Sequence, residues 1–212
     1  MKKTIIRPIG LPDTISTQVV TPIMPSVVYA SKNPNELDKQ YEGKEKGFTY
    51  AREGHPNAEI LANLLGRMEG NSSGLVVSSG MAAVTALTMG VCSSGDHILG
   101  GDQLYGRSLR LMNEDLPRFG IETSFADPTD VGAIRKAIRP NTKLILVETV
   151  SNPTLRVADL EEISKVCKQN KILMAVDNTF TTPLATKPFQ LGADFVIHSI
   201  TKLLAGHSDV TL

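Results

Sequence analysis

The chain has 212 residues, 41% of them hydrophobic and 21% charged, which is the balance of a globular protein with one well-packed domain and at most a small second piece. Its formal net charge is zero, so composition gives no general attraction to nucleic acid or to an anionic membrane. The chain has only two cysteines, without metal-ligand spacing, which argues against a disulfide scaffold. No apolar run is long enough to span a bilayer, and no signal-peptide pattern follows Met1. These features predict a cytoplasmic protein.

Residues 1–56 differ in composition from the rest of the chain. They hold six prolines and show little amphipathic periodicity, which is typical of an extended, loop-rich arm. An arm of this length buries little of itself, so we expect it to lie over another surface, with a neighbouring subunit as the candidate.

The rest of the chain, residues 57–212, alternates between two periodicities. Apolar residues at helical spacing predict a helix over 57–68, and further helices are expected from Gly80, after Gly106, around 131–138 and over 160–167. Short apolar runs predict strands at 74–78, 96–99, 121–125, 143–147, 172–176 and 194–198. This pattern indicates an α/β fold with a mostly parallel sheet and helices on both faces, in which ligands bind beyond the carboxyl ends of the strands.

Lys202 follows the last predicted strand by a few residues, with apolar neighbours. A lysine buried at a strand end has a lowered amine pKa and can form a Schiff base with an aldehyde. The alternative is a solvated surface lysine, the common state of this residue. Ser199 and Thr201 stand at alternate positions beside it, so their hydroxyls can point the same way and hold a phosphate.

Two further strand ends carry groups that suit a phosphorylated ring. Ser79-Gly80-Met81 turns into a helix, where free N–H groups favour an anion, although such a turn is also ordinary helix punctuation. Asp177 ends an apolar strand, where its carboxylate needs a cationic or donor partner such as a protonated pyridine nitrogen, or the N–H groups of the next turn.

Two tyrosines are candidates in loops. Tyr105 could stack on a planar ring or serve only in packing. Tyr50 and Arg52, at alternate positions of the arm, could bind a phosphate if the arm reaches a site, and Arg52 is otherwise solvated. His97 and His198 are interpreted as strand histidines, and Cys167 as a core residue on an apolar helix face.

Six motifs in order resemble the Cys/Met-metabolism (trans-sulfuration) family of pyridoxal-phosphate enzymes, which includes cystathionine γ-synthase, the cystathionine lyases and methionine γ-lyase. The resemblance covers the chain from the Tyr50 region to Leu212. The motifs are Tyr50-Ala51-Arg52, Ser79-Gly80-Met81-Ala82-Ala83, Tyr105-Gly106, Glu148-Thr149-Val150-Ser151-Asn152-Pro153, Asp177-Asn178-Thr179, and Ser199-Ile200-Thr201-Lys202 with Gly206-His207-Ser208-Asp209.

This resemblance implies the large domain of the fold type I transferases and a role for each residue. Lys202 would carry pyridoxal 5'-phosphate as a Schiff base and then move protons, and Tyr105 would stack on the ring and assist deprotonation. Asp177 would hold the pyridine nitrogen, and Asn152 would lie near substrate. The phosphate would be held by Gly80, Met81, Ser199 and Thr201, completed by Tyr50 and Arg52 from a neighbouring subunit of a dimer of dimers.

The function that the resemblance implies is β- or γ-elimination or γ-replacement on cystathionine, cysteine, methionine or an activated homoserine, with a lyase favoured over a synthase. The alternative is a truncated, catalytically silent domain that binds the cofactor or pairs with family subunits. A third possibility is an α/β domain without the cofactor.

Two departures from the family pattern stand out. Arg107 follows Tyr105-Gly106 where the family has a small residue or a cysteine, so its charge could alter substrate choice or face solvent. The chain also ends within a predicted strand at 210–212, without the family's smaller C-terminal domain and its carboxylate-binding arginine. The sequence is therefore interpreted as a fragment of a longer protein.

Overall fold

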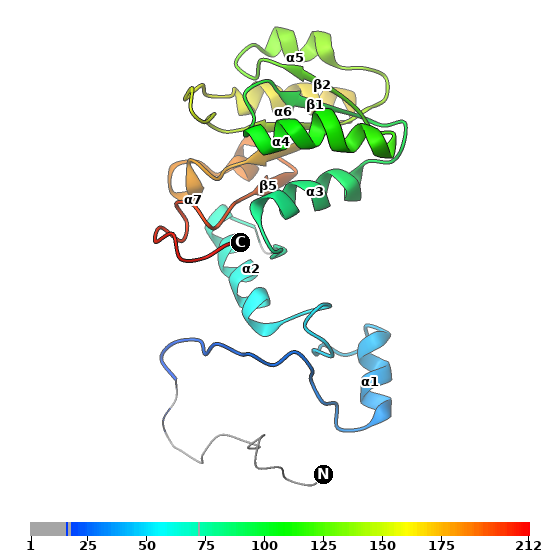
Figure 1. The fold of residues 1–212 in the computed structure, drawn as a ribbon, viewed down its shortest axis with the longest axis vertical. Coiled ribbons are helices and arrows are strands. Elements are labelled where there is room, and N and C mark those ends of the chain that lie inside the picture. Colours follow the sequence, from blue (N-terminus) through cyan, green and yellow to red (C-terminus); the bar gives the residue numbers. More distant parts are fainter. Residues whose placement is uncertain (1–15, 17, 72) are drawn as a thin grey trace. The chain divides into compact units, whose positions relative to one another are not determined.

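The computed structural model describes residues 16, 18–71 and 73–212, and the chain divides into two compact units. The first unit ends at Asn57 and the second comprises Ala58–Leu212. Each is described by itself, with the elements labelled in Figure 1.

The first unit is largely extended and holds one complete helix, α1 (Pro34–Tyr41), among its described residues. The Asn33 side chain caps α1 by accepting the Glu36 N–H at 3.0 Å, and none of the α1 residues is buried. A single antiparallel bridge joins Val28 to Tyr50. The predicted arm of 1–56 therefore has, over its described part, the exposed and irregular character that its prolines indicate.

The second unit is built on a five-stranded sheet in the order β2-β1-β3-β4-β5. All four strand pairs are parallel, as predicted from the alternation of strands and helices. The strands are β1 (His97–Gly101), β2 (Glu122–Ala126), β3 (Thr142–Glu148), β4 (Leu173–Asp177) and β5 (Phe195–Ile197).

Helices cover both faces of this sheet, as the sequence predicts (Figure 1). The α-helices are α2 (Pro56–Glu69), α3 (Gly80–Val91), α4 (Gly106–Arg110), α5 (Val131–Ala137), α6 (Leu160–Asn170) and α7 (Thr182–Ala185). Helix α4 continues into a π-helical turn, η1 (Leu111–Asp115), and a 3-10 turn, η2 (Leu116–Phe119), and a second 3-10 turn, η3 (Pro188–Leu191), precedes β5.

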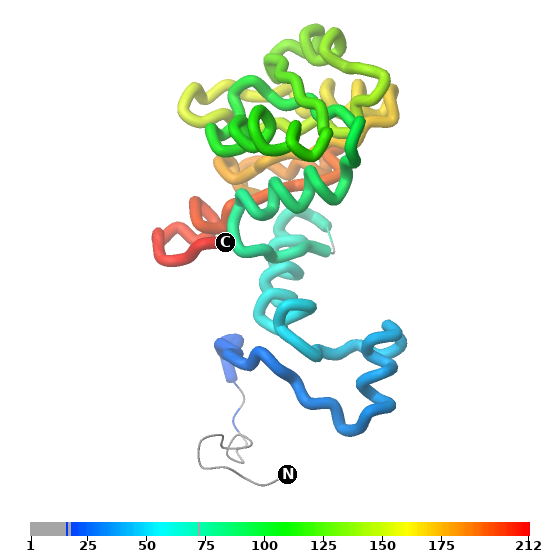
Figure 2. Tube along the Cα trace, turned by 45° about the vertical axis from the view of Figure 1, so that its right-hand side comes forward, coloured from blue at the N-terminus to red at the C-terminus, as the bar shows by residue number. Residues whose placement is uncertain are grey.

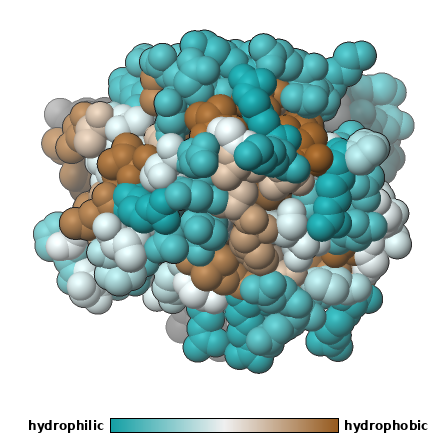
Figure 3. All heavy atoms as spheres, turned by 90° about the horizontal axis from the view of Figure 1, so that it is seen from above, coloured by the Kyte–Doolittle hydropathy of each residue, from teal (hydrophilic) through white to brown (hydrophobic). Residues whose placement is uncertain are grey.

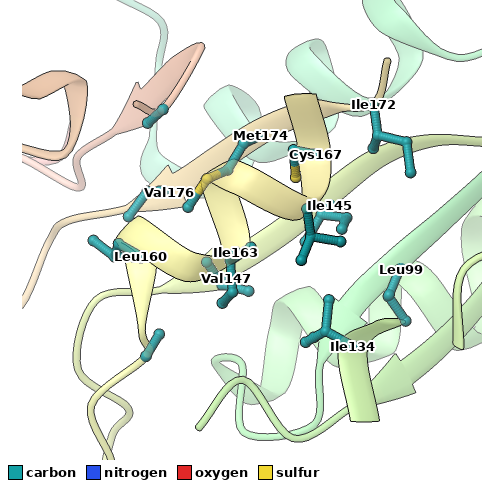
Figure 4. Close-up of a cluster of buried hydrophobic side chains, with 13 residues drawn as sticks. Leu99, Ile134, Ile145, Val147, Leu160, Ile163, Cys167, Ile172, Met174 and Val176 are labelled. Atoms are coloured by element: carbon teal, nitrogen blue, oxygen red, sulfur yellow. The ribbon is translucent and has the colours of Figure 1, made fainter. Parts of the chain in front are cut away.

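The strand β3 is apolar without alternation because both of its faces are buried. Ile145 and Val147 belong to the core under α5 and α6, whereas Leu144 and Leu146 belong to the core on the opposite face with α3. Figure 4 shows the first of these cores, where Ile163 of α6 lies among the strand residues. The loops that follow the strands therefore start from a sheet that is packed on both faces.

Two predicted strands are wrong. Residues 74–78 and 210–212 have no strand partner, and Leu75 is 83% exposed. A strand needs a neighbouring backbone to satisfy its N–H and C=O groups. Between the segment 73–77 and the edge strand β5 there is instead a cavity of about 470 Å³, lined by apolar residues of α2, α3 and β5 together with Glu69, His198 and Leu212.

The surface seen in Figure 3 is mainly hydrophilic, with apolar side chains exposed between the hydrophilic ones. Within residues 16, 18–71 and 73–212, no helix combines the length and the apolar character needed to cross a membrane. The same ranges contain no group of three or more His, Cys, Asp or Glu side chains that could hold a metal ion.

Candidate active site

The carboxyl ends of β3, β4 and β5 meet at one edge of the sheet. The register pairs Glu148 with Asp177 and Asp177 with Ile197, so the residues that follow these strands start side by side. The segment after β5, coloured red in Figures 1 and 2, runs beside the start of α3. The topology therefore brings together the motifs that begin at Ser79, Glu148, Asp177 and Ser199, and the Tyr105 loop joins them through Glu148.

Asp177 is held at the end of β4 in a desolvated setting. Its Oδ1 accepts the backbone N–H of Thr179 at 3.0 Å. Burial is the largest influence on its carboxyl and raises the pKa of Asp177, against the hydrogen bonds from Thr179 and the nearby His198, which lower it. A buried carboxylate of this kind is stabilised in its charged form by a cationic partner.

The start of α3 packs directly against the segment after β5. The Ser79 side chain caps α3 by accepting the Ala82 N–H at 3.1 Å. A side-chain Cβ on Gly80 would lie 2.7 Å from the Ser199 Cβ, so only glycine allows this close approach. The N–H groups of the first turn of α3 therefore lie next to Ser199, and Met81 is the second residue of that turn.

The hydroxyls of Ser199 and Thr201 reach one oxygen atom. Both hydroxyls donate to the carbonyl oxygen of Leu212, at 3.5 and 3.1 Å respectively, and Thr201 Oγ1 also accepts the Leu212 N–H at 3.0 Å. The Ser199 N–H donates to Thr179 Oγ1 at 2.8 Å, which ties this segment to the residue that follows Asp177 and Asn178. The two hydroxyls thus converge on a common acceptor, the arrangement that an anion also needs.

Lys202 lies in a turn beyond β5, and its side chain is exposed. Of the two alternatives that the sequence leaves open, a buried strand-end lysine and a solvated one, the structure shows the solvated one, because β5 ends at Ile197 and residues 200–205 form turns that carry the lysine away from the core. Its backbone is ordered by two hydrogen bonds, one from its N–H to the Ser199 carbonyl and one from the Gly206 N–H to its own carbonyl, at 3.1 and 2.9 Å.

Tyr105 and Asn152 lie on two loops at the same edge. Tyr105 precedes α4, is 48% exposed, and donates its backbone N–H to Glu148 Oε1 at 2.6 Å. Asn152 is exposed in the loop after β3, and its backbone N–H also hydrogen-bonds Glu148. Arg107, in the first turn of α4, faces solvent.

Glu148 has a strongly altered acidity. Burial is the largest cause and, with the charge of Asp177, raises the pKa of Glu148 to about 7, while the hydrogen bonds from the Tyr105 and Asn152 backbone act in the opposite direction. The sequence motif contains Glu148, but nothing in the sequence assigned it a role. The sequence feature that could have indicated a role for Glu148 is its position at the end of a buried strand.

A buried polar network, which no sequence pattern indicates, lies behind the strand ends. His198 Nε2 lies 2.5 Å from Glu69 Oε1, and Asn178 donates to the same oxygen at 3.1 Å. The Thr149 hydroxyl donates to Asn178 Oδ1 at 2.7 Å. His198 was interpreted as a strand histidine, but it follows β5 and joins the end of α2 to the sheet.

Tyr50 and Arg52 belong to the first unit. There the Arg52 guanidinium carbon lies 4.8 Å from the centre of the Tyr50 ring, and Arg52 also approaches Glu53 at 3.8 Å. Both side chains are exposed. The pair therefore presents a phenol and a guanidinium together at the surface of this unit.

Comparison with known proteins relates this arrangement to a family. The family model described as "Cys/Met metabolism PLP-dependent enzyme" matches residues 4–212. The chain is 45% identical over 168 residues to a cystathionine gamma-lyase of Bacillus subtilis (strain 168), covering 79% of this chain and 44% of the relative. It is 36% identical over 198 residues to a cystathionine gamma-synthase/O-acetylhomoserine (thiol)-lyase of the same organism, covering 93% and 51%.

A solved structure gives the same result in three dimensions. It is a putative O-acetylhomoserine (thiol)-lyase of Campylobacter jejuni, with a TM-score of 0.89, 33% identity, and coverage of 92% of this chain and 48% of the other, and its description names an N'-pyridoxyl-lysine-5'-monophosphate. This chain thus spans about half the length of the relatives that it matches. The sequence match and the fold together show that the chain belongs to the Cys/Met-metabolism family of enzymes that depend on pyridoxal phosphate (PLP).

Proposed function

We propose that this protein is a PLP-dependent enzyme of sulfur amino-acid metabolism. It catalyses β- or γ-elimination or γ-replacement on cystathionine, cysteine, methionine or an activated homoserine, and a lyase is favoured over a synthase. The observation that carries the proposal is the meeting of Asp177, the Gly80 turn and the Ser199 and Thr201 hydroxyls at one edge of the sheet.

The residues at this edge fit the cofactor in two respects. Asp177 is a desolvated carboxylate, and a protonated pyridine nitrogen is the kind of partner that would compensate its buried charge. The bare backbone of Gly80 next to Ser199 forms a cradle that a Cβ would fill, and it places helix N–H groups beside two hydroxyls. Ring nitrogen and phosphate therefore each have a suitable set of donors or acceptors.

The proposal assigns each residue at this edge a role. Asp177 holds the ring nitrogen, and Gly80, Met81, Ser199 and Thr201 hold the phosphate. Tyr105 covers the ring face, and Asn152 lies toward the substrate. The cofactor, when bound, supplies an electron sink for the carbanion formed at the substrate α-carbon. Lys202 Nζ would be the point of covalent attachment for the cofactor and would carry the α-proton; the residue directly follows Thr201, and its backbone N–H donates to the Ser199 carbonyl.

The assembly and location of the protein are part of the same proposal. Tyr50 and Arg52 complete the phosphate site of a neighbouring subunit, in a homo-oligomer built as a dimer of dimers. Their exposed, paired arrangement on the first unit supports this contribution across an interface. The protein acts in the cytoplasm on a small amino acid.

Turnover is the test of the activity. The protein is mixed with PLP and with cystathionine, cysteine or methionine, and release of a keto acid is measured for the parent and for Lys202→Ala. We expect release from at least one substrate and its loss in the variant. Cofactor binding with no release from any substrate, in the parent, would overturn the enzymatic proposal and support the alternative of a catalytically silent domain.

A further inference from the structure

We propose that Glu148 is a positioning residue, which fixes the loops that carry Tyr105 and Asn152 over the strand-end site. The inference rests on the proposed function for its consequence, since both loops would border the cofactor. The contacts themselves are properties of this chain alone.

The geometry joins three segments at one carboxylate. Glu148 is the last residue of β3, the central strand of the sheet, and its register partner is Asp177 of β4. Glu148 Oε1 accepts the Tyr105 N–H at 2.6 Å across 43 residues of sequence, and the Asn152 N–H is its second backbone donor.

The loop before α4 has no other side-chain cap for its helix. Tyr105 occupies the N-cap position (φ −47°, ψ 134°) and makes no side-chain cap hydrogen bond. The residue is 48% exposed, and its carbonyl accepts the Leu109 N–H at 3.0 Å within the helix. The bond from its N–H to Glu148 is the contact that joins this residue to the end of β3.

The charges around Glu148 separate its role from that of Asp177. Asp177 is its register partner on β4 and the charged group that acts on it, and burial together with this neighbour raises the pKa of Glu148 to about 7. Asp102, in the loop that carries Tyr105, lies 3.9 Å from Arg156. Glu148 Oε1 accepts a backbone N–H from the loop before α4, whereas Asp177 Oδ1 accepts one from the turn that follows its own strand.

The test compares Glu148→Ala, which removes the acceptor, with Glu148→Gln, which keeps an uncharged oxygen at the same reach. Glu161→Ala, an exposed glutamate on α6, is the matched control. Hydrogen exchange of the Tyr105 amide is followed by NMR in the full chain without cofactor. The circular dichroism band of added PLP, which reports how the ring is held, is the second measurement.

We expect Tyr105 exchange about tenfold or more faster in Glu148→Ala, and within about threefold of the parent in Glu148→Gln and in the control. The cofactor band should weaken in Glu148→Ala and return in Glu148→Gln. If Glu148→Ala fails to fold, Glu148→Asp decides, because it withdraws the carboxylate by about 1.5 Å, one C–C bond, and should release the same amide.

Unchanged exchange of Tyr105 in the variant without an acceptor would overturn the inference, as would equal losses of the cofactor band in Glu148→Ala and Glu148→Gln. Exchange is measured without cofactor, so a protein that binds no PLP would refute the proposed function and leave this result standing. Failure of the two proposals can therefore be told apart.

Discussion

The contact between Gly80 and Ser199 makes the most local prediction about the site. Replacing Gly80 by alanine adds one methyl group at the point where α3 begins. That Cβ would lie 2.7 Å from the Ser199 Cβ and 3.1 Å from its Oγ. Non-bonded carbon atoms pack at about 3.5–4.0 Å, so the two segments must separate by about 1 Å.

The cost follows from the packing of both segments. Ser199 is tied to Thr179 and Leu212 by hydrogen bonds, and the first turn of α3 is capped by Ser79, so neither side moves freely. Overpacking of this kind costs about 1–3 kcal/mol. In a chain of this size that corresponds to a fall in Tm of about 2–12 °C. The phosphate cradle would open at the same time.

Thermal unfolding by circular dichroism and PLP affinity are the two assays. Gly90→Ala is the matched control, because Gly90 lies in the same helix with nothing within 4 Å of an added Cβ. It should be neutral or gain up to about 1 kcal/mol. Adding Ser199→Gly to Gly80→Ala removes the two nearest atoms but leaves the Cα of residue 199 at 3.2 Å, so it should restore part of the stability lost to the clash. If Gly80→Ala matches Gly90→Ala in both Tm and PLP affinity, the close approach of the two segments is refuted.

Three further predictions concern the second unit. Ile163→Ala removes a fully buried side chain from the core under α6 and should lower the free energy of unfolding by about 2–5 kcal/mol in a urea titration. Glu69→Ala removes the hydrogen-bond partner of the buried His198 side chain and should lower the free energy of unfolding by about 1–3 kcal/mol. Glu69→Gln keeps an acceptor and should lower it by less, and equal losses would contradict the hydrogen bond. Burial raises the pKa of Cys92 to about 11 and that of Cys167 to about 12, so neither thiol should react with a disulfide reagent at pH 8 until urea unfolds the chain.

The sequence was sufficient to predict the parallel sheet because its signal is local. The apolar run of β3 reflects burial on both faces, and Asp177 marks a strand end by its position after the apolar residues of β4. The segment 74–78 also has an apolar run, but a strand requires a partner strand, and the residues of one segment do not determine whether it has one.

The unpredicted features of the site have the same origin. The sequence leaves open whether Lys202 is buried or solvated, because the turns after Ile197 and the length of β5 depend on its neighbours in the fold. Glu69 and His198 are 129 residues apart, so their contact exists only in the folded chain. The role of Glu148 depends on Tyr105, 43 residues away, in the same manner.

The central claim is that Lys202 carries the cofactor. The protein is incubated with PLP, reduced with borohydride, digested and mapped by mass spectrometry, with Lys202→Ala treated in parallel. We expect a reduced pyridoxyl group on the peptide that contains Lys202 and none there in the variant. Labelling spread over other exposed lysines such as Lys165 and Lys171, or no labelling at all, would contradict this assignment.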